Sequence, residues 1–277
     1  MATTFANAPL VELIAELRWN DGTVVPFAQG VNPAGVGNGG PGIRIQFGGP
    51  DNEAFFMRFG GELYKNGFQA SERLVPPNFP IVGGQPVYRF KASNETGVSP
   101  VLYQIGAGMF SVNAVPPYKT WAEFRPNVEQ GIRSLLAARA SDQQAEPFST
   151  LSLRYIDAFR PPLTRDLEVG AFIEKVLGID IKLPDALTKK LAEGQHIKPL
   201  LQLNIPMDGL MMAFTVAEGA VNGEPAILMD TTVSSNTPIV ADYNEVMGVF
   251  QRAHEVIHDV FMSLTRSLFD DMGPVGG

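Results

Sequence analysis

The feature that most constrains the fold is an order of elements that occurs twice along the chain. In each half, a strand with alternating apolar residues is followed by a helix, several further strands and a long closing helix. A half of this kind has to cover its apolar sheet face, and two such halves can join their sheets edge to edge. The order therefore predicts an α+β fold with pseudo-duplicated halves, in which a joined, curved and largely antiparallel sheet carries the helices packed on one face.

The opening strands of the two halves carry the clearest patterns. The segment LVELIAELRW at residues 10–19 has an apolar residue at every second position, and LSLRYIDAF at residues 151–159 opens the second half. We expect Asp51 and Asn52 to cap a helix at about 53–66. Further helices are expected at about 169–177 and 185–193, a hairpin turn at 106–108, and further strands at about 43–47, 87–92, 200–205, 210–216 and 226–233.

The closing helices define the ends of the two halves. One is expected at about 120–139, where Thr120 and Glu123 form a capping box, and the other at about 243–269. The polar stretch at residues 138–147, which follows the first of these helices, is the best candidate for the junction between the halves. We therefore expect an N-terminal half at 1–140 and a C-terminal half at 148–277, together forming one compact unit.

Composition narrows the class of protein. The chain has 21 Lys and Arg residues against 29 Asp and Glu residues, which gives a formal net charge of −8 and disfavours general DNA or membrane binding. Cysteine is absent, which excludes disulfides, thiolate catalysis and cysteine-ligated metals. No secretory signal is visible at the start, and the longest uncharged run, residues 96–118, is interrupted by Gly and Pro. We expect a cytoplasmic protein without membrane contacts.

Residues 30–50 are dominated by Gly, Pro and Asn. The GVGNGG run lacks the lysine and the strand–loop–helix context of a phosphate-binding loop. A flexible surface loop is the better interpretation, and its role stays open.

Three segments together resemble a known family. They are the opening NAPLVELIAELRW, the central FSVNAVPPYKTWAEFRPNVEQGI and the strand LSLRYIDAF. They resemble the N-x-P-x-V-E start, the V-N-x-x-P-P-Y-x-x-W-x-x-F centre and the L-R-Y-I strand of a sporadically distributed family of uncharacterised prokaryotic proteins of about this length. The resemblance covers nearly the whole chain except the glycine-rich insert. It implies no particular activity or ligand, although a patchy distribution would fit phage-defence or other mobile loci.

The central segment contains the first set of candidate binding residues. Asn113 ends a strand, and Tyr118 and Trp121 place two large amphipathic side chains at the start of a helix. The simpler interpretation is a structural unit that joins hairpin to helix, with Trp121 buried. The functional alternative is a recognition surface formed by Asn113, Tyr118 and Trp121.

Arg18 and Arg154 are a second set of candidates, because each arginine lies within a sheet-forming strand. Together with Glu16 and Asp157 they are expected to form a buried polar network between the opening strands. The alternative is that the two arginines bind an anionic ligand.

Residues 254–258 read His-Glu-Val-Ile-His, which matches the H-E-x-x-H pattern of zinc hydrolases. In such a site His254 and His258 would bind the metal and Glu255 would be the general base. A catalytic zinc needs a third ligand, which here would come from distant sequence, for instance His196 or an acidic residue. We therefore expect no cofactor and treat the two histidines as polar residues at a helix edge.

No complete catalytic set is visible, so we assign no catalytic residue and lean against an enzyme. The leading hypothesis is a binding or assembly protein, with a protein partner or self-association, including a homodimer, favoured over nucleic acid. One alternative is a nucleic-acid-binding or nucleotide-binding protein, and the other is the zinc hydrolase. The basic residues that a nucleic-acid interface would have to bring together are Arg18, Arg44, Arg58, Arg73, Arg89, Lys91 and Arg154.

Overall fold

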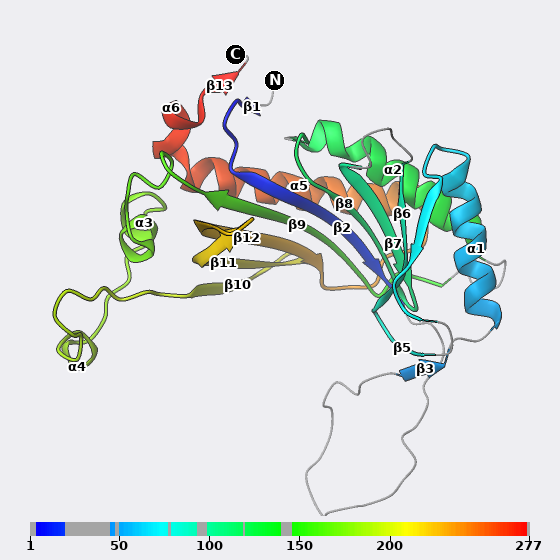
Figure 1. The fold of residues 1–277 in the computed structure, drawn as a ribbon, viewed down its shortest axis with the longest axis horizontal. Helices are drawn as coiled ribbons and strands as arrows, with labels where there is room; N and C mark the ends of the chain where they lie inside the picture. Colours follow the sequence, from blue (N-terminus) through cyan, green and yellow to red (C-terminus); the bar gives the residue numbers. More distant parts are fainter. Residues whose placement is uncertain are drawn as a thin grey trace, which may run out of the picture.

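The computed structural model describes residues 4–19, 45–47, 50–76, 79–92, 99–118, 120–139 and 146–275. A nine-stranded antiparallel sheet forms the body of the protein (Figure 1). Its order is β10 (Leu201–Met207), β11 (Leu210–Val221), β12 (Glu224–Ser235), β9 (Thr150–Phe159), β2 (Leu10–Arg18), β8 (Met109–Ala114), β7 (Val101–Gly106), β6 (Pro86–Lys91) and β4 (Ala70–Arg73). The opening strands of the two halves, β2 and β9, therefore pair in the middle of the sheet.

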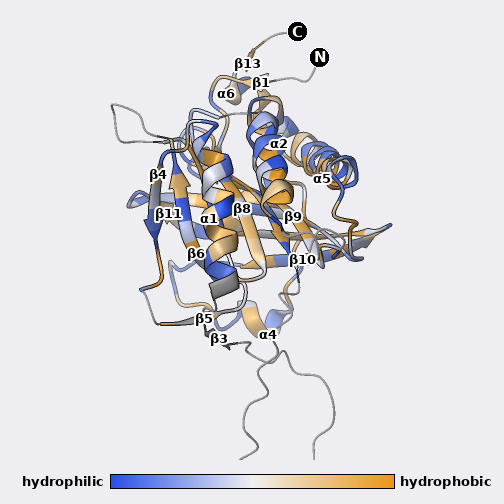
Figure 2. Ribbon diagram, turned by 90° about the vertical axis from the view of Figure 1, so that its right-hand side faces the viewer, coloured by the Kyte–Doolittle hydropathy of each residue, from blue (hydrophilic) through white to orange (hydrophobic). Residues whose placement is uncertain are grey.

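Three long helices cover one face of this sheet: α1 (Pro50–Tyr64), α2 (Trp121–Ala138) and α5 (Tyr243–Leu264). Figure 2 shows them on the same side of the strands, with α2 next to both α1 and α5. The short helix α3 (Val169–Lys175) packs on this face at β11. We call the opposite side, which no described helix covers, the open face.

The order of elements matches the expected fold. The first half runs β2, α1, β6, β7, β8, α2, with the short β4 added at the edge, and the second runs β9, α3, β10, β11, β12, α5. The sheet order is symmetric about the β2–β9 pair, apart from β4. The predicted α+β class, with one joined antiparallel sheet and its long helices on one face, is confirmed.

Short elements complete the chain. The helix α4 (Asp185–Thr188) lies in a long connection, and the 3-10 helix η1 (Arg266–Leu268) and helix α6 (Phe269–Met272) follow α5. Near the two ends of the chain, β1 (Thr4–Phe5) pairs with β13 (Pro274–Val275). Strands β3 (Ile45–Phe47) and β5 (Pro80–Val82) form a second small sheet.

Local sequence explains the main elements. In β2, Leu13, Ala15 and Leu17 face the helices and are buried, as their alternation predicts. The predicted cap of α2 is present, since the backbone N–H of Glu123 donates to Thr120 Oγ1 at 3.3 Å.

Some boundaries differ from the expectation. Helix α1 begins at Pro50, so Asp51 and Asn52 lie inside its first turn and are not its cap; proline fits that first position because no helical N–H is needed there. The helix expected at 185–193 is only the four-residue α4, which buries no residue and so has no packing to extend it. The last long helix ends at Leu264, before η1 and α6.

The glycine-rich segment lies almost wholly outside the described residues. Among the described residues, no helix has both the length and the apolar character needed to cross a bilayer.

Candidate functional site

A cavity of about 360 Å³ lies on the helix-covered side of the sheet. Strand β9, helix α5, the start of α2 and the N-terminal segment enclose it. Apolar and aromatic side chains form most of the lining: Phe5, Ala8, Leu10, Trp121, Ala122, Ile257, Phe261 and Met262. The polar lining residues are Thr4, Thr120, Tyr155, Asp157, Thr231, His254 and His258.

Two elements place most of the polar groups. Tyr155 and Asp157 alternate along β9 toward the helices, and Thr231 stands opposite Tyr155 on β12. On α5, His254 and His258 are one helical turn apart and lie on the side that faces β9. The cavity is thus a gap between strand β9 and helix α5.

The N-terminal segment forms another wall of the cavity. Strand β1 is held by β13, and Thr4 Oγ1 donates to the Val275 carbonyl at 2.9 Å. The Phe5 ring lies 5.1 Å from that of Phe269 and 6.4 Å from that of Phe261, between ring centroids. Figure 1 shows β1 and β13 close together near α6. The first and last strands therefore close one side of the cavity together.

Asp157 is the most unusual group in the lining. It is 3% exposed, and no described residue donates a hydrogen bond to its carboxyl group. Burial raises the pKa of this carboxyl to about 7, and the negative charge of Asp230 on β12 acts in the same direction. The carboxyl of Asp157 lines the cavity, where it can accept hydrogen bonds from a ligand.

His254, which also lines the cavity, is held neutral at neutral pH. Burial, and secondarily the charge of His258, lower the pKa of His254 to about 4. Its Nδ1 shares a hydrogen bond of 3.0 Å with the Tyr155 hydroxyl, whose pKa burial raises. The Trp121 ring stacks on the imidazole, with centroids 5.4 Å apart, and its Nε1 donates to Gln251 Oε1 at 2.9 Å. The imidazole is thus fixed by the Trp121 ring stacked on it and by the hydrogen bond to the Tyr155 hydroxyl.

The H-E-x-x-H residues do not act as a unit in this arrangement. His254 and His258 both line the cavity, with ring centroids 5.7 Å apart. Glu255 is exposed outside the cavity, where its Oε1 accepts a hydrogen bond from Gln251 Nε2 at 3.0 Å, and His196 lies in an exposed segment. Within the described part of the chain, no group of three or more His, Asp or Glu side chains is arranged to hold a metal. Glu255 therefore lies outside the cavity that a general base would have to face.

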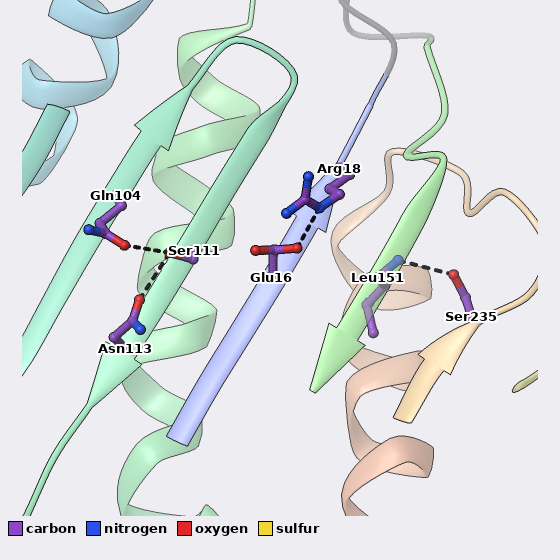
Figure 3. Close-up of polar contacts among 7 residues, drawn as sticks. All are labelled: Glu16, Arg18, Gln104, Ser111, Asn113, Leu151 and Ser235. Atoms are coloured by element: carbon purple, nitrogen blue, oxygen red, sulfur yellow. Dashed lines mark hydrogen bonds and ion pairs between the residues drawn. The ribbon is translucent and has the colours of Figure 1, made fainter. Parts of the chain in front are cut away.

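The buried polar network expected between the opening strands is not formed: among the described residues, Arg18 pairs within β2, Arg154 pairs with β12, and no ion pair joins β2 to β9. On the open face, Arg18 Nε donates to Glu16 Oε1 at 2.6 Å (Figure 3). Arg154 Nε donates to the Asp230 carboxylate at 2.9 and 3.0 Å. The inclusion of Asp157 was wrong: it is three residues from Arg154 on one strand, so the two side chains point to opposite faces of the sheet.

The structure does not bring Asn113, Tyr118 and Trp121 together. Asn113 lies on the open face, where its Nδ2 donates to Glu12 Oε1 at 3.0 Å and its Oδ1 accepts from the Ser111 hydroxyl at 2.9 Å (Figure 3). Tyr118 accepts a hydrogen bond from Asn127 on α2. Trp121 is 6% exposed, in the wall of the cavity on the other side of the sheet.

The basic residues proposed for nucleic acid are also dispersed. Arg58 donates to the Ala138 carbonyl, Arg73 pairs with Glu53 on α1, and Arg44 lies outside the described residues. The described charged residues of the open-face strand positions are four cations and five acids: Arg18, Arg89, Lys91, Arg154, Glu12, Glu16, Glu72, Glu224 and Asp230. Each of these cations contacts a carboxylate. This balance does not favour a polyanion on that face.

Sequence reasoning named Trp121, His254 and His258 but missed Tyr155 and Thr231 and assigned Asp157 to the wrong face. A signal was present in LSLRYIDAF. Tyr155 and Asp157 have the same alternation as the buried Leu151 and Leu153, so an acidic residue occupies a core-facing position. A carboxyl group in that position needs a hydrogen-bond or ion-pair partner from the protein or from a ligand.

Comparisons of the chain with models of protein families, with curated proteins and with solved structures find no match. The resemblance drawn from the three sequence segments therefore stays a prediction. The residues of the cavity carry the functional argument.

Proposed function

We propose that this protein binds a small organic molecule in the cavity between β9 and α5. The observation that carries the proposal is the buried Asp157 carboxyl, which lines an apolar cavity without a hydrogen-bond partner. A ligand in the cavity can donate hydrogen bonds to this carboxyl, to which no described residue donates.

The shape and lining of the cavity support the same function. Pockets that hold small ligands have volumes of about 300–1,000 Å³ and are mainly apolar with a few polar groups that fix the ligand. The cavity has this composition, with Asp157, Thr231 and the Tyr155–His254 pair on the walls. Without a nucleophile–base pair or a third metal ligand among the described residues, binding is better supported than catalysis.

A thermal-unfolding screen against a panel of small organic compounds tests this function. The variant Ala122→Phe places a large side chain at an exposed position of the cavity lining, and Ala137→Phe places the same side chain on an exposed position of α2 outside the cavity. We expect compounds that stabilise the wild type and Ala137→Phe but not Ala122→Phe. The proposal is wrong if no compound stabilises the wild type, or if Ala122→Phe responds equally.

A second candidate function, self-assembly, is favoured by a separate observation. Nine of the fifteen exposed large apolar residues in the described part of the chain lie between Ile181 and Met211. This segment runs through α4, which projects from the body in Figure 1, to the edge strand β10. Strand β10 has an unpaired edge and no charged residue, so the same strand of a second copy can extend the sheet without charge repulsion.

The oligomeric state of the protein tests this second candidate. We expect a concentration-dependent dimer in light scattering, and the variant Ile205→Lys, at an exposed position of β10, should be monomeric. A monomer at all concentrations would rule this function out and would leave the cavity proposal unaffected.

A further inference from the structure

We infer that the ligand of this cavity is a small organic cation, an amine on an apolar or aromatic body, whose ammonium group binds Asp157. This inference rests on the proposed function and specifies the chemical class of the ligand. It follows from the charges, the hydrogen-bonding groups and the rings that line the cavity.

The charges of the lining favour a cation over an anion. The described lining contains no lysine or arginine, and Asp157 is its one acidic residue. His254 is held neutral by burial, which leaves His258, also in the lining, as the one side chain there that can carry a positive charge. A carboxylate or phosphate ligand would therefore share the cavity with the Asp157 carboxyl and would have no lysine or arginine to offset its charge.

The hydrogen-bonding groups and rings suit a cation. An ammonium group donates hydrogen bonds, and the Asp157 carboxylate and the Thr231 hydroxyl, both on the sheet side of the cavity, can accept them. Binding would convert a buried, unpaired carboxyl into a hydrogen-bonded ion pair, the form in which buried charges are tolerated. The ring of Trp121 lines the same cavity, and cations bind favourably to the face of an indole.

The protonation of Asp157 makes the inference testable in the unmodified protein. The free carboxyl titrates near pH 7, whereas the bound form must be ionised. Below that pH, ligand binding has to expel a proton. The affinity for an amine should therefore rise about tenfold between about pH 6 and pH 8, while the affinity for a neutral analogue should stay constant.

Ligand binding can be followed by the fluorescence of a tryptophan in the cavity wall. Trp19 and Trp121 are the two tryptophans, so Trp19→Phe leaves Trp121, in the cavity wall, as the single emitter. The emission of this variant is titrated with benzylamine, benzyl alcohol and benzoate, which share a ring and differ in charge. The same titrations are repeated with Asp157→Asn and with the control Asp230→Asn, which removes a carboxylate from the opposite face of the sheet.

We expect benzylamine to bind at least about tenfold more tightly than benzyl alcohol at about pH 8, and benzoate not to bind. This preference should fall on going to about pH 6 in the Trp19→Phe chain and should be lost in Asp157→Asn. It should be kept at about pH 8 in Asp230→Asn, where loss of the Asp230 charge lowers the pKa of Asp157 and favours its ionised form. If Asp157→Asn does not fold, the preference for benzylamine over benzyl alcohol and benzoate in the Trp19→Phe chain decides the question.

The results that overturn the inference are distinct from those that overturn the proposed function. If benzyl alcohol or benzoate binds as tightly as benzylamine, the cavity is a binding site but does not select a cation. If none of the three binds although other compounds in the thermal screen do, the inference also fails and the function stands. If neither experiment finds a ligand, both are wrong.

Discussion

The substitution Asp157→Asn should stabilise the protein, and the gain should depend on pH. The carboxyl has a pKa of 3.8 as a free side chain and of about 7 in the fold. Since the folded state holds the proton more tightly, the contribution of Asp157 to stability is fully present below about pH 4 and is lost as the pH rises through 7. An asparagine has no charge to bury and avoids this loss.

The magnitude follows from the shift of about three pKa units. Each unit corresponds to about 1.4 kcal/mol, so the full loss in the wild type approaches about 4 kcal/mol above pH 7. Local relaxation around a buried charge reduces this value, and we expect Asp157→Asn to be more stable than the wild type by about 2–4 kcal/mol at about pH 8. At about pH 4 the two proteins should be nearly equally stable, because both side chains are then neutral.

Denaturant unfolding at about pH 4 and pH 8, followed by tryptophan fluorescence and circular dichroism, measures this difference. His254 contributes in the opposite direction: its lowered pKa gives stability above pH 6.5 that is lost as the pH falls toward 4. Both chains contain His254, so its contribution cancels in the difference between them.

The control Asp230→Asn makes the same change in charge on the open face. It removes the partner of Arg154 and should cost up to about 1 kcal/mol. The account of Asp157 is refuted if Asp157→Asn is less stable than the wild type at about pH 8, or if its effect is the same at both pH values.

Three further predictions concern the scaffold and are measured by thermal or denaturant unfolding. Trp121→Ala should lower stability by about 3–5 kcal/mol, since this side chain is buried; an unchanged melting temperature would contradict a structural role for it. Thr120→Ala removes the cap of α2 and should cost about 1 kcal/mol, and no loss would mean that the cap is not formed in solution. In α1, Gly60→Ala should destabilise the protein by about 1–3 kcal/mol, because the new Cβ would lie 2.7 Å from the buried Phe90 ring. Gly61→Ala has open space around the new Cβ and should stabilise the protein by about 0.5–1 kcal/mol. Equal effects of the two substitutions would contradict the packing of α1 on β6.

Much of the fold could be predicted from the sequence because its signals are local. The alternation in LVELIAELRW and LSLRYIDAF determines which face of β2 and β9 is buried. The cap at Thr120 marks the start of α2 within one residue. The need for a glycine at position 60 of α1 could not be predicted, because it comes from a contact with Phe90, which is distant in sequence.

The candidate site could be predicted only in part because it depends on tertiary neighbours. His254 and His258 are visible in the sequence as a motif. The motif does not show that the Tyr155 hydroxyl forms a hydrogen bond with His254 Nδ1. The separation of Arg154 from Asp157 follows from strand alternation and could have been predicted. The sequence does not reveal that the Asp157 carboxyl lacks a hydrogen-bond donor. This depends on the residues of α5, β12 and the N-terminal segment that surround the cavity.

The most direct test of the central claim is the titration of the Asp157 carboxyl itself. In protein labelled with ¹³C-aspartate, the Cγ resonance of Asp157 is identified by its absence in Asp157→Asn. It can then be followed by NMR from about pH 4 to pH 9, with and without benzylamine. We predict a midpoint of about 7 in the free protein, and a midpoint at least about one unit lower when benzylamine is bound. A midpoint of about 4 in the free protein would show a solvated or already paired carboxyl, and would contradict the account of this cavity as a binding site built around Asp157.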